Sequence, residues 1–170
     1  MRIAIGSDHR GVELKAGLVA RLAGAGHEVL DLGCDGSAAC DYPDPAVAVG
    51  EAVAAGACEL GILLCGSGIG VSIAANKVRG VRAARCRDLA DAVVSRRHND
   101  ANVICLGADG ASLQQVWDLV QAWLVEPFEG GRHAPRVAKI RRYEAARERS
   151  GARPAPPAPK GAEGDGTDDR

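Results

Sequence analysis

The sequence predicts an α/β fold: a three-layer αβα sandwich built around a five-stranded parallel sheet. Two observations lead to this prediction. Short aliphatic runs alternate along the chain with segments of helical periodicity, which is the order that βα units give in a parallel sheet. The runs are also apolar on consecutive positions, as expected of strands that are buried on both faces.

The elements follow one another regularly. Strands are predicted over residues 2–6, 28–32, 60–65, 81–86 and 102–106. Helices are predicted over 12–25, 45–55, 68–77, 88–97 and 111–124, and a basic helical segment within 135–149. This arrangement is Rossmann-like, and it forms one domain over 1–149. Residues 150–170 are rich in Gly and Pro and lack large apolar side chains, so we expect a disordered tail there.

Composition excludes several function classes. The net charge of −1 argues against a nucleic-acid partner and against a membrane-surface partner. No stretch approaches the roughly 18 uninterrupted apolar residues of a membrane span, and the start of the chain does not resemble a signal peptide. We therefore expect a cytoplasmic protein whose thiols are reduced.

The six cysteines contain neither a CxxC pair nor a Cys/His cluster with zinc spacing, so no metal site is predicted. Most of them are interpreted as small apolar residues of the core or of loops.

Parallel sheets bind ligands beyond the carboxyl ends of their strands. That rule selects residues 7–10, 33–42, 65–70 and 86–88. The most informative of these segments is Cys65-Gly-Ser-Gly-Ile-Gly70, where a buried strand enters a glycine turn and then a helix. Free amides and the positive end of the helix favour an anion there. Cys65 beside them is in a setting that favours the reactive thiolate, and a buried inert cysteine is the alternative.

The glycine pattern is GxGxG, not the GxGxxG of dinucleotide sites, and no acidic residue ends the next strand. No organic cofactor is therefore predicted. Arg85 and Arg87 stand at that strand end, so an NADP-linked oxidoreductase is kept as an alternative.

Three polar segments contain histidine: Asp8-His9, His98-Asn99-Asp100 and Arg132-His133. They could contribute to a shared site or be solvated loops. Arg132 and Arg136 lie four residues apart, so they would share one helical face if that segment is helical. Such a pair can clamp a phosphate, although spacing alone favours a solvated basic helix.

Five separated motifs occur in a characteristic order: GSDHRG at 6–11, DYP at 41–43, CGSGIGVSIAANK at 65–77, RRHND at 96–100 and EGGRH at 129–133. With these motifs the chain resembles the ribose-5-phosphate isomerase B family, which includes galactose-6-phosphate isomerases, from about residue 2 to residue 145. The resemblance implies a cofactor-free and metal-free aldose–ketose isomerase that interconverts D-ribose 5-phosphate and D-ribulose 5-phosphate through a cis-ene-diolate. It also implies a homodimer, or a tetramer of such dimers, with active sites shared between subunits.

The resemblance implies a role for each matching residue. Cys65 would be the base at C2, Ser67 would move a proton between O1 and O2, and His98 would open the furanose ring. The substrate-binding residues would be Asp8 and Asn99 at sugar oxygens, His9 and Tyr42 in the pocket, the loop residues Gly66, Gly68, Ile69 and Gly70 at the ene-diolate oxygen, and Arg132 and Arg136 at the phosphate. Family members that lack the cysteine use a glutamate where this chain has Val71, so this chain resembles the cysteine type.

One position departs from the family pattern. The family has an arginine that helps to bind phosphate after the fifth strand, where this chain has Asp109. A carboxylate near a phosphate is repulsive by roughly 1 kcal/mol or more. Either Arg132, Arg136 and a neighbour such as Lys139 compensate, or the loop is displaced, or the substrate is another C4–C6 sugar phosphate. A non-catalytic phosphate- or nucleotide-binding module is the alternative from a different functional class.

Overall fold

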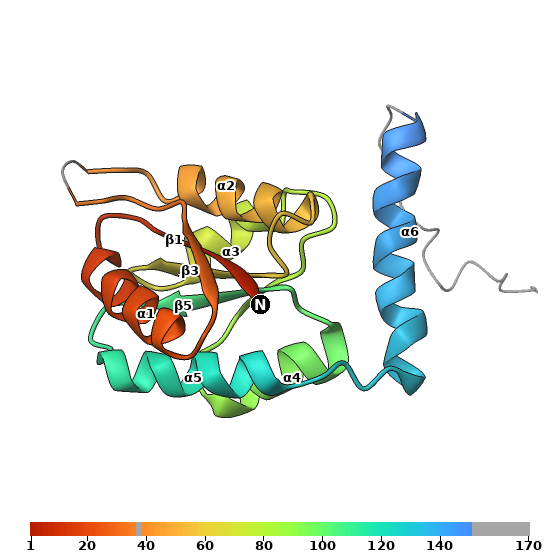
Figure 1. Ribbon diagram of the computed structural model, residues 1–170. Coiled ribbons are helices and arrows are strands. Elements are labelled where there is room, and N and C mark those ends of the chain that lie inside the picture. Colours follow the sequence, from red (N-terminus) through yellow and green to blue (C-terminus); the bar gives the residue numbers. More distant parts are fainter. Residues whose placement is uncertain (37–38, 151–170) are drawn as a thin grey trace, which may run out of the picture.

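The computed structural model describes residues 1–36 and 39–150, with side chains up to Arg147 (Figure 1). The predicted tail begins at its edge, and residues 151–170 lie outside the described part of the chain. Among the described residues, no helix is both long and apolar enough to cross a membrane.

The predicted parallel sheet is confirmed. Its five strands are β1 (Arg2–Ser7), β2 (Glu28–Asp31), β3 (Leu60–Cys65), β4 (Ala83–Arg85) and β5 (Val103–Gly107). Their order across the sheet is β2-β1-β3-β5-β4, and every neighbouring pair is parallel. All carboxyl ends therefore meet at one edge of the sheet, where the fold leaves room for a ligand.

Helices cover both faces of this sheet (Figure 1). On one face lie α1 (Val12–Gly24), α4 (Leu89–Asn99) and α5 (Leu113–Val125), and on the other lie α2 (Pro43–Ala54) and α3 (Ile69–Ala75). Successive strand residues point to opposite faces, which produces two separate apolar cores. In β3, Ile62 and Leu64 join the first core, whereas Leu63 and Cys65 join the second. The side chain of Cys65 thus faces the α2/α3 layer.

Two elements, β4 and α3, are shorter than predicted at both ends. The fourth strand was expected over 81–86, but only Ala83–Arg85 pair with β5. The Asn102 side chain accepts the amide N–H of Arg82 at 2.7 Å, and Asn76 accepts that of Ala83 at 2.9 Å. The Asn102 side chain thus takes the Arg82 amide in place of a backbone carbonyl, whereas the Cys86 amide still donates to Cys105 O of β5 at 3.0 Å. Similarly, α3 starts at Ile69 because Gly68 has a left-handed backbone with φ 75°.

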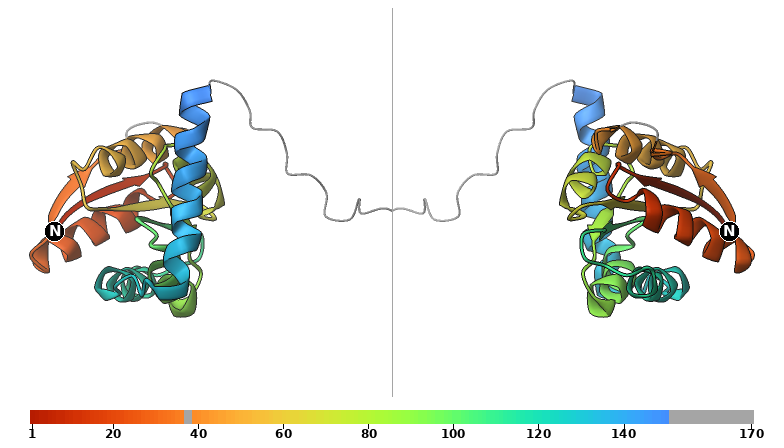
Figure 2. Two further views of the ribbon diagram at one scale, coloured as in Figure 1. Left: turned by 90° about the vertical axis from the view of Figure 1, so that its right-hand side faces the viewer. Right: turned by 90° about the vertical axis from the view of Figure 1, so that its left-hand side faces the viewer.

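The last helix, α6 (Ala134–Ser150), follows a short 3₁₀ turn, η1 (Gly131–His133). It stands beside the sandwich, across the level of both helical layers (Figure 1 and Figure 2). Arg141 Nη2 on this helix donates to Asp100 Oδ2 at 2.9 Å, and Glu144 Oε2 accepts the amide N–H of Gly80 at 3.3 Å. These polar contacts hold α6 to the body while Ile140 and Tyr143 remain exposed.

Candidate active site

The glycine loop after β3 brings a backbone donor onto the sulfur of Cys65. The amide N–H of Gly68 donates to Cys65 Sγ, with an N···S distance of 3.1 Å. Gly68 has φ 75°, and a Cβ there would lie 2.9 Å from the carbonyl carbon of Leu106. Both the backbone conformation and the close approach to β5 therefore require glycine. The contact places a backbone donor on the side chain of Cys65, a residue that is only 5% exposed.

Ser67 closes the same turn. Its Oγ accepts the amide N–H of Ile69 at 3.2 Å, while its carbonyl oxygen accepts from Arg85 Nε at 3.0 Å. The Ser67 side chain is exposed at the carboxyl edge of the sheet. Its hydroxyl is thus held at the open side of the loop, two residues after Cys65.

Tyr42 lies against the far side of the loop. It directly precedes α2, and a Cβ on Gly70 would come within 2.8 Å of its ring. A larger residue at position 70 would clash with the tyrosine ring, which explains why glycine is found there. The structure brings together two predicted site residues that are far apart in sequence.

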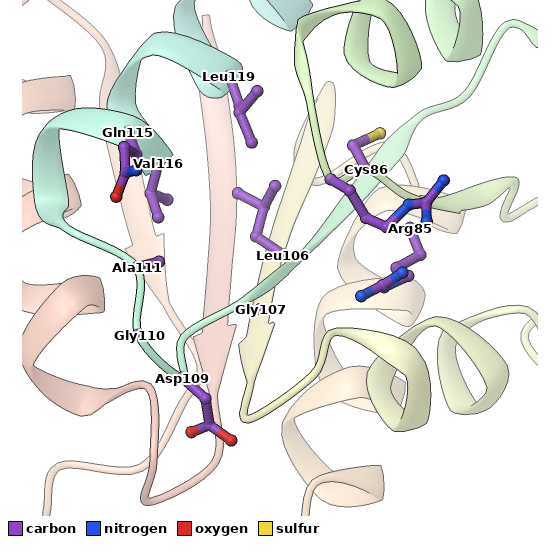
Figure 3. A pocket seen from close by; sticks show the side chains of 11 residues that line it. Arg85, Cys86, Leu106, Gly107, Asp109, Gly110, Ala111, Gln115, Val116 and Leu119 are labelled. Atoms are coloured by element: carbon purple, nitrogen blue, oxygen red, sulfur yellow. The ribbon is translucent and has the colours of Figure 1, made fainter.

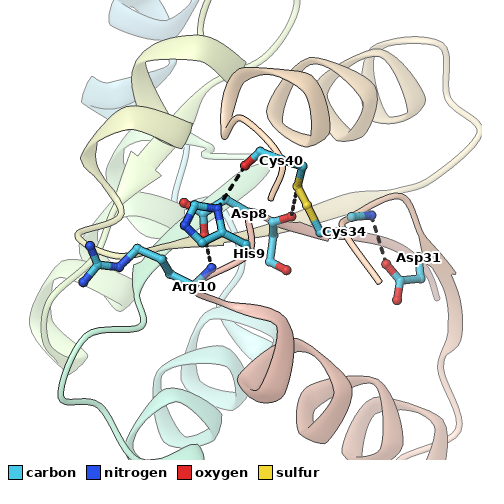
Figure 4. The surroundings of a disulfide bond; sticks show 8 residues. Asp8, His9, Arg10, Asp31, Cys34 and Cys40 are labelled. Carbon is cyan, nitrogen blue, oxygen red and sulfur yellow. Dashed lines mark hydrogen bonds between the residues drawn. A yellow bond between two sulfur atoms is a disulfide. The ribbon is translucent and has the colours of Figure 1, made fainter. Parts of the chain in front are cut away.

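The β1–α1 loop completes this group (Figure 4). The Asp8 amide donates to Leu64 O at 3.2 Å, which places Asp8 beside β3. The buried Asp8 carboxylate accepts the amide N–H of Arg10 at 2.9 Å and so fixes the loop. The exposed ring of His9 has its Nδ1 3.2 Å from the carbonyl oxygen of Cys40. Asp8, His9, Tyr42 and residues 65–70 thus gather at the carboxyl edge.

Two of the six cysteines differ from the prediction. Cys34 and Cys40 form a disulfide across the loop between β2 and α2 (Figure 4), whereas reduced thiols were expected throughout. The pairing was missed because a six-residue separation in a loop carries no periodic signal. The remaining cysteines, Cys58, Cys65, Cys86 and Cys105, are free and buried.

Two of the buried free thiols, Cys86 and Cys105, have a strongly raised pKa. Burial in the core raises the pKa of Cys86 to about 11. It raises the pKa of Cys105 well above its ordinary value. Both are therefore protonated at neutral pH. Gly68 N–H points at Cys65 instead, so the expected inert cysteines and the expected reactive one have different surroundings.

A second polar group surrounds His98, at the end of α4. The His98 and His133 rings stack with centroids 4.1 Å apart, and His98 Nε2 lies 3.7 Å from Glu129 Oε2. Arg132 Nε donates to His133 Nε2 at 3.3 Å. Burial, followed by the charges of His98 and Arg132, lowers the pKa of His133. Asn99 and Arg136 belong to the same two elements, α4 and α6.

These two groups lie at opposite edges of the sheet. Cys65 pairs with Gly107, the last residue of β5, whereas Asn99 precedes Val103, the first residue of β5. At about 3.3 Å per residue, β5 alone separates them by about 13 Å. Within one chain, the structure therefore brings Asp8, His9, Tyr42 and residues 65–70 together, and keeps them apart from His98, Asn99, Arg132 and Arg136.

His98, Glu129 and His133 offer nitrogen and oxygen atoms that lie within 4.8 Å of one another. Their geometry does not favour a metal ion. Stacked rings with an interplanar angle of 6° direct their nitrogen lone pairs along parallel planes instead of toward one point. The Arg132 guanidinium also occupies His133 Nε2 and would repel a cation. The cluster suits the binding and transfer of protons.

The residues that suggested an NADP site line a cavity of about 280 Å³ at the ends of β4 and β5 (Figure 3). Its walls include the apolar side chains of Leu106 and Leu119. Arg85 donates to the Ser67 carbonyl, and Arg87 pairs with Asp91 at 3.5 Å. Both guanidinium groups are thus engaged by the protein, which weakens the NADP alternative.

A strand-end thiol under a backbone donor, at the ligand-binding edge of a parallel sheet, defines an α/β protein suited to proton transfer on a small molecule. The family model described as Ribose/Galactose Isomerase matches residues 3–140. The chain belongs to this family, and it is a sugar-phosphate isomerase. The family predicted from the sequence motifs is thereby confirmed.

Individual relatives agree with this assignment. Ribose-5-phosphate isomerase B of Escherichia coli is 46% identical over 143 residues, which cover 84% of this chain and 96% of that protein. D-erythrulose-4-phosphate isomerase of Pectobacterium atrosepticum is 42% identical over 145 residues, which cover 85% and 95%. The structure of Clostridium thermocellum ribose-5-phosphate isomerase B superimposes with a TM-score of 0.83 at 49% identity, covering 86% of this chain and 99% of that one.

Proposed function

We propose that this enzyme interconverts D-ribose 5-phosphate and D-ribulose 5-phosphate, without a metal or organic cofactor. The proposal rests on the hydrogen bond that the Gly68 amide donates to Cys65 Sγ at the ligand-binding edge of the sheet. Removing a proton beside a carbonyl requires a base and a way to stabilise the developing negative charge. The loop supplies both within six residues.

The proposed reaction begins with the opening of the sugar ring. His98 assists opening of the furanose ring, which exposes the C1 aldehyde. The Cys65 thiolate takes the proton from C2, and the electron pair moves through C1 to O1, which gives a cis-ene-diolate. Ser67 passes the O2 proton to O1, and the Cys65 thiol returns its proton to C1. The product is the ketose, and the thiolate is restored.

Backbone amides of the loop are placed to stabilise the ene-diolate oxygen. The amide of Gly68 is committed to Cys65, and that of Ile69 to Ser67. Within the described residues, the amides of Ser67 and Gly70 have no protein acceptor. They lie on both sides of the Cys65 contact, as an oxyanion site next to the base requires.

The active site is completed by a second copy of the chain. The separation of about 13 Å along β5 keeps His98, Asn99, Arg132 and Arg136 away from Cys65 of the same chain. Ile69 and Ile73 project exposed from α3, beside the glycine loop. An apolar surface next to half of a site fits a subunit interface. In the homodimer, His98 would therefore act on the sugar held by the partner's loop. We also propose a cytoplasmic location for the enzyme, as expected from its sequence.

A four-carbon sugar phosphate is the second candidate substrate. Asp109 stands where the family resemblance predicts an arginine at the phosphate, and the Pectobacterium relative carries the name of a D-erythrulose-4-phosphate isomerase. A shorter substrate would place its phosphate differently relative to position 109.

The decisive experiment follows the C2 proton by NMR, with ribose 5-phosphate in deuterated water. The parent enzyme should exchange this proton and form ketose. Cys65→Ala should lose both activities by about 10²-fold or more, the range for removing a general base. Cys58→Ala is the matched control, since Cys58 is a free, buried cysteine outside the site. Turnover of erythrulose 4-phosphate alone would favour the second candidate, and full activity of Cys65→Ala would exclude Cys65 as the base.

A further inference from the structure

Arg10 and Asp109 form a two-pronged ion pair between loops that are 99 residues apart. Arg10 Nε donates to Asp109 Oδ1 at 3.0 Å, and Nη2 donates to Oδ2 at 2.6 Å. Arg10 belongs to the β1–α1 loop directly after His9, and Asp109 follows β5. The pair therefore joins the two strands that flank β3 on either side.

This pair lies directly over the catalytic loop. A Cβ on Gly66 would come 2.8 Å from Asp109 Oδ2 and 2.9 Å from Arg10 Nε. Gly66 is next to Cys65, so the absence of a side chain lets the guanidinium approach the loop backbone. The Arg10 and Asp109 side chains are 55% and 50% exposed, which leaves their outer side open at the ligand-binding edge.

The contact pattern leaves one edge of the guanidinium free. Arginine carries five N–H donors arranged in a rigid plane. Asp109 takes one from Nε and one from Nη2. Both donors of Nη1 and the second donor of Nη2 remain, and among the described residues none of these has an acceptor. Together they form the end-on fork that matches two oxygens of a phosphate.

We propose that Arg10, oriented by Asp109, binds the phosphate of the substrate through this free edge; this deepens the proposed function and rests on it. Asp109 is then a positioning residue, and its charge is neutralised by the same contact that aims Arg10. The predicted repulsion between Asp109 and phosphate is thereby removed without displacing the loop. Arg132 and Arg136 would reach the same phosphate from the partner subunit.

A purely structural role explains the pair less well. Exposed ion pairs contribute little to folding stability, whereas this pair has a glycine beneath it and an open donor edge at the substrate side. Arg2 and Glu28 provide the comparison within the same chain. Their exposed pair joins Nε to Oε1 at 3.0 Å and lies at the start of β1 and β2, at the opposite edge of the sheet.

The test separates phosphate binding from stability. Arg10→Ala should raise KM for ribose 5-phosphate about tenfold to a hundredfold, the range for a charge-assisted hydrogen bond, while kcat changes little. It should weaken the binding of inorganic phosphate, titrated by ³¹P NMR, by a similar factor. Arg2→Ala, the matched control, should leave both quantities unchanged. Asp109→Asn should raise KM by a smaller factor, because a neutral amide aims the guanidinium less firmly.

Exchanging the two charges gives a rescue experiment. In Arg10→Asp/Asp109→Arg the pair is rebuilt with its cation on the other loop, so KM and phosphate affinity should recover most of the loss. Unchanged KM and phosphate affinity in Arg10→Ala would overturn the proposal. Thermal destabilisation without any change in phosphate affinity would also overturn it. The phosphate titration does not depend on turnover, so a parent enzyme that binds phosphate through Arg10 but leaves ribose 5-phosphate unchanged would contradict only the proposed reaction.

Discussion

Gly68 and Cys65 are linked by a hydrogen bond from backbone amide to sulfur, at 3.1 Å, that depends on a left-handed residue at position 68. The sulfur belongs to a rigid, buried strand, and the amide to the turn that leads into α3. The strand fixes the proposed base and the turn fixes its donor. The chemistry of the site is therefore coupled to the conformation of one residue.

Substituting Gly68 should accordingly damage both stability and catalysis. In Gly68→Ala, the new Cβ would lie 2.9 Å from Leu106 and φ 75° would be strained, so we expect a loss of about 1–3 kcal/mol in unfolding free energy. Isomerase activity should fall further than stability predicts, because the donor moves away from the sulfur. Urea unfolding and steady-state kinetics measure the two effects.

Gly56→Ala is the matched control. Gly56 has φ 73° but no atom within 4 Å of the added Cβ, so it carries the same backbone strain without the clash. It should lose stability and retain kcat. Equal kinetic losses in both variants would mean that the Gly68 contact has no special role in catalysis.

Much of this geometry could be predicted from the sequence. The apolar runs located all five strands, because strands buried on both faces need consecutive apolar residues. The strand-end rule then selected Asp8, Tyr42 and Cys65, which the structure brings to one edge. Local sequence patterns predicted the position of a residue correctly wherever a single strand or helix determines that position.

Pairings between distant loops could not be predicted in this way. The contact of Arg10 with Asp109 spans two loops without periodicity, and Asp109 by itself indicated only repulsion. The placement of His98 at the opposite edge follows from the direction of α4, which runs back toward the start of β5. The order of the elements alone is enough to predict this placement of His98. The matching motifs, however, do not indicate which subunit supplies which half of a site.

The buried thiol of Cys86 should make the fold sensitive to alkaline pH. Its pKa is raised by burial from about 9 to about 11. The unfolded chain therefore releases this proton first, and the contribution of Cys86 to stability is complete below about pH 9 and lost as pH rises toward 11. The loss amounts to roughly 2 kcal/mol. Urea unfolding at pH 8 and pH 10.5 should show it, with a smaller pH dependence in Cys86→Ala. Identical pH dependence in both proteins would contradict the assignment.

The disulfide between Cys34 and Cys40 should affect the substrate pocket. Its loop carries the carbonyl of Cys40 that contacts His9 and leads into Tyr42. Alkylation of the unreduced, denatured protein should label only the four free cysteines, and reduction should release two more thiols. Reduction should raise KM for the sugar phosphate more than it lowers kcat, because Cys65 is not part of the loop. The Cys34→Ser/Cys40→Ser variant should be insensitive to the reductant; an equal response would point to another thiol.

The separation of Cys65 from His98 within one chain gives the sharpest test of the shared site. If each site takes its loop from one subunit and His98 from the other, Cys65→Ala and His98→Ala should each be inactive as pure dimers. In a mixed dimer, one site carries both substitutions and the other carries neither. Random exchange of subunits should therefore restore about one quarter of the parental sites, since about half of the dimers are mixed.

The control distinguishes complementation from residual activity. Exchange between Cys65→Ala and the double variant Cys65→Ala/His98→Ala should restore nothing, because no Cys65 is present in either chain. Activity should appear at the rate of subunit exchange, followed by mass spectrometry of the intact dimers. Mixed dimers that form without any gain of activity would place Cys65 and His98 in the same chain's site, and would require α4 and α6 to move across the about 13 Å that β5 puts between them.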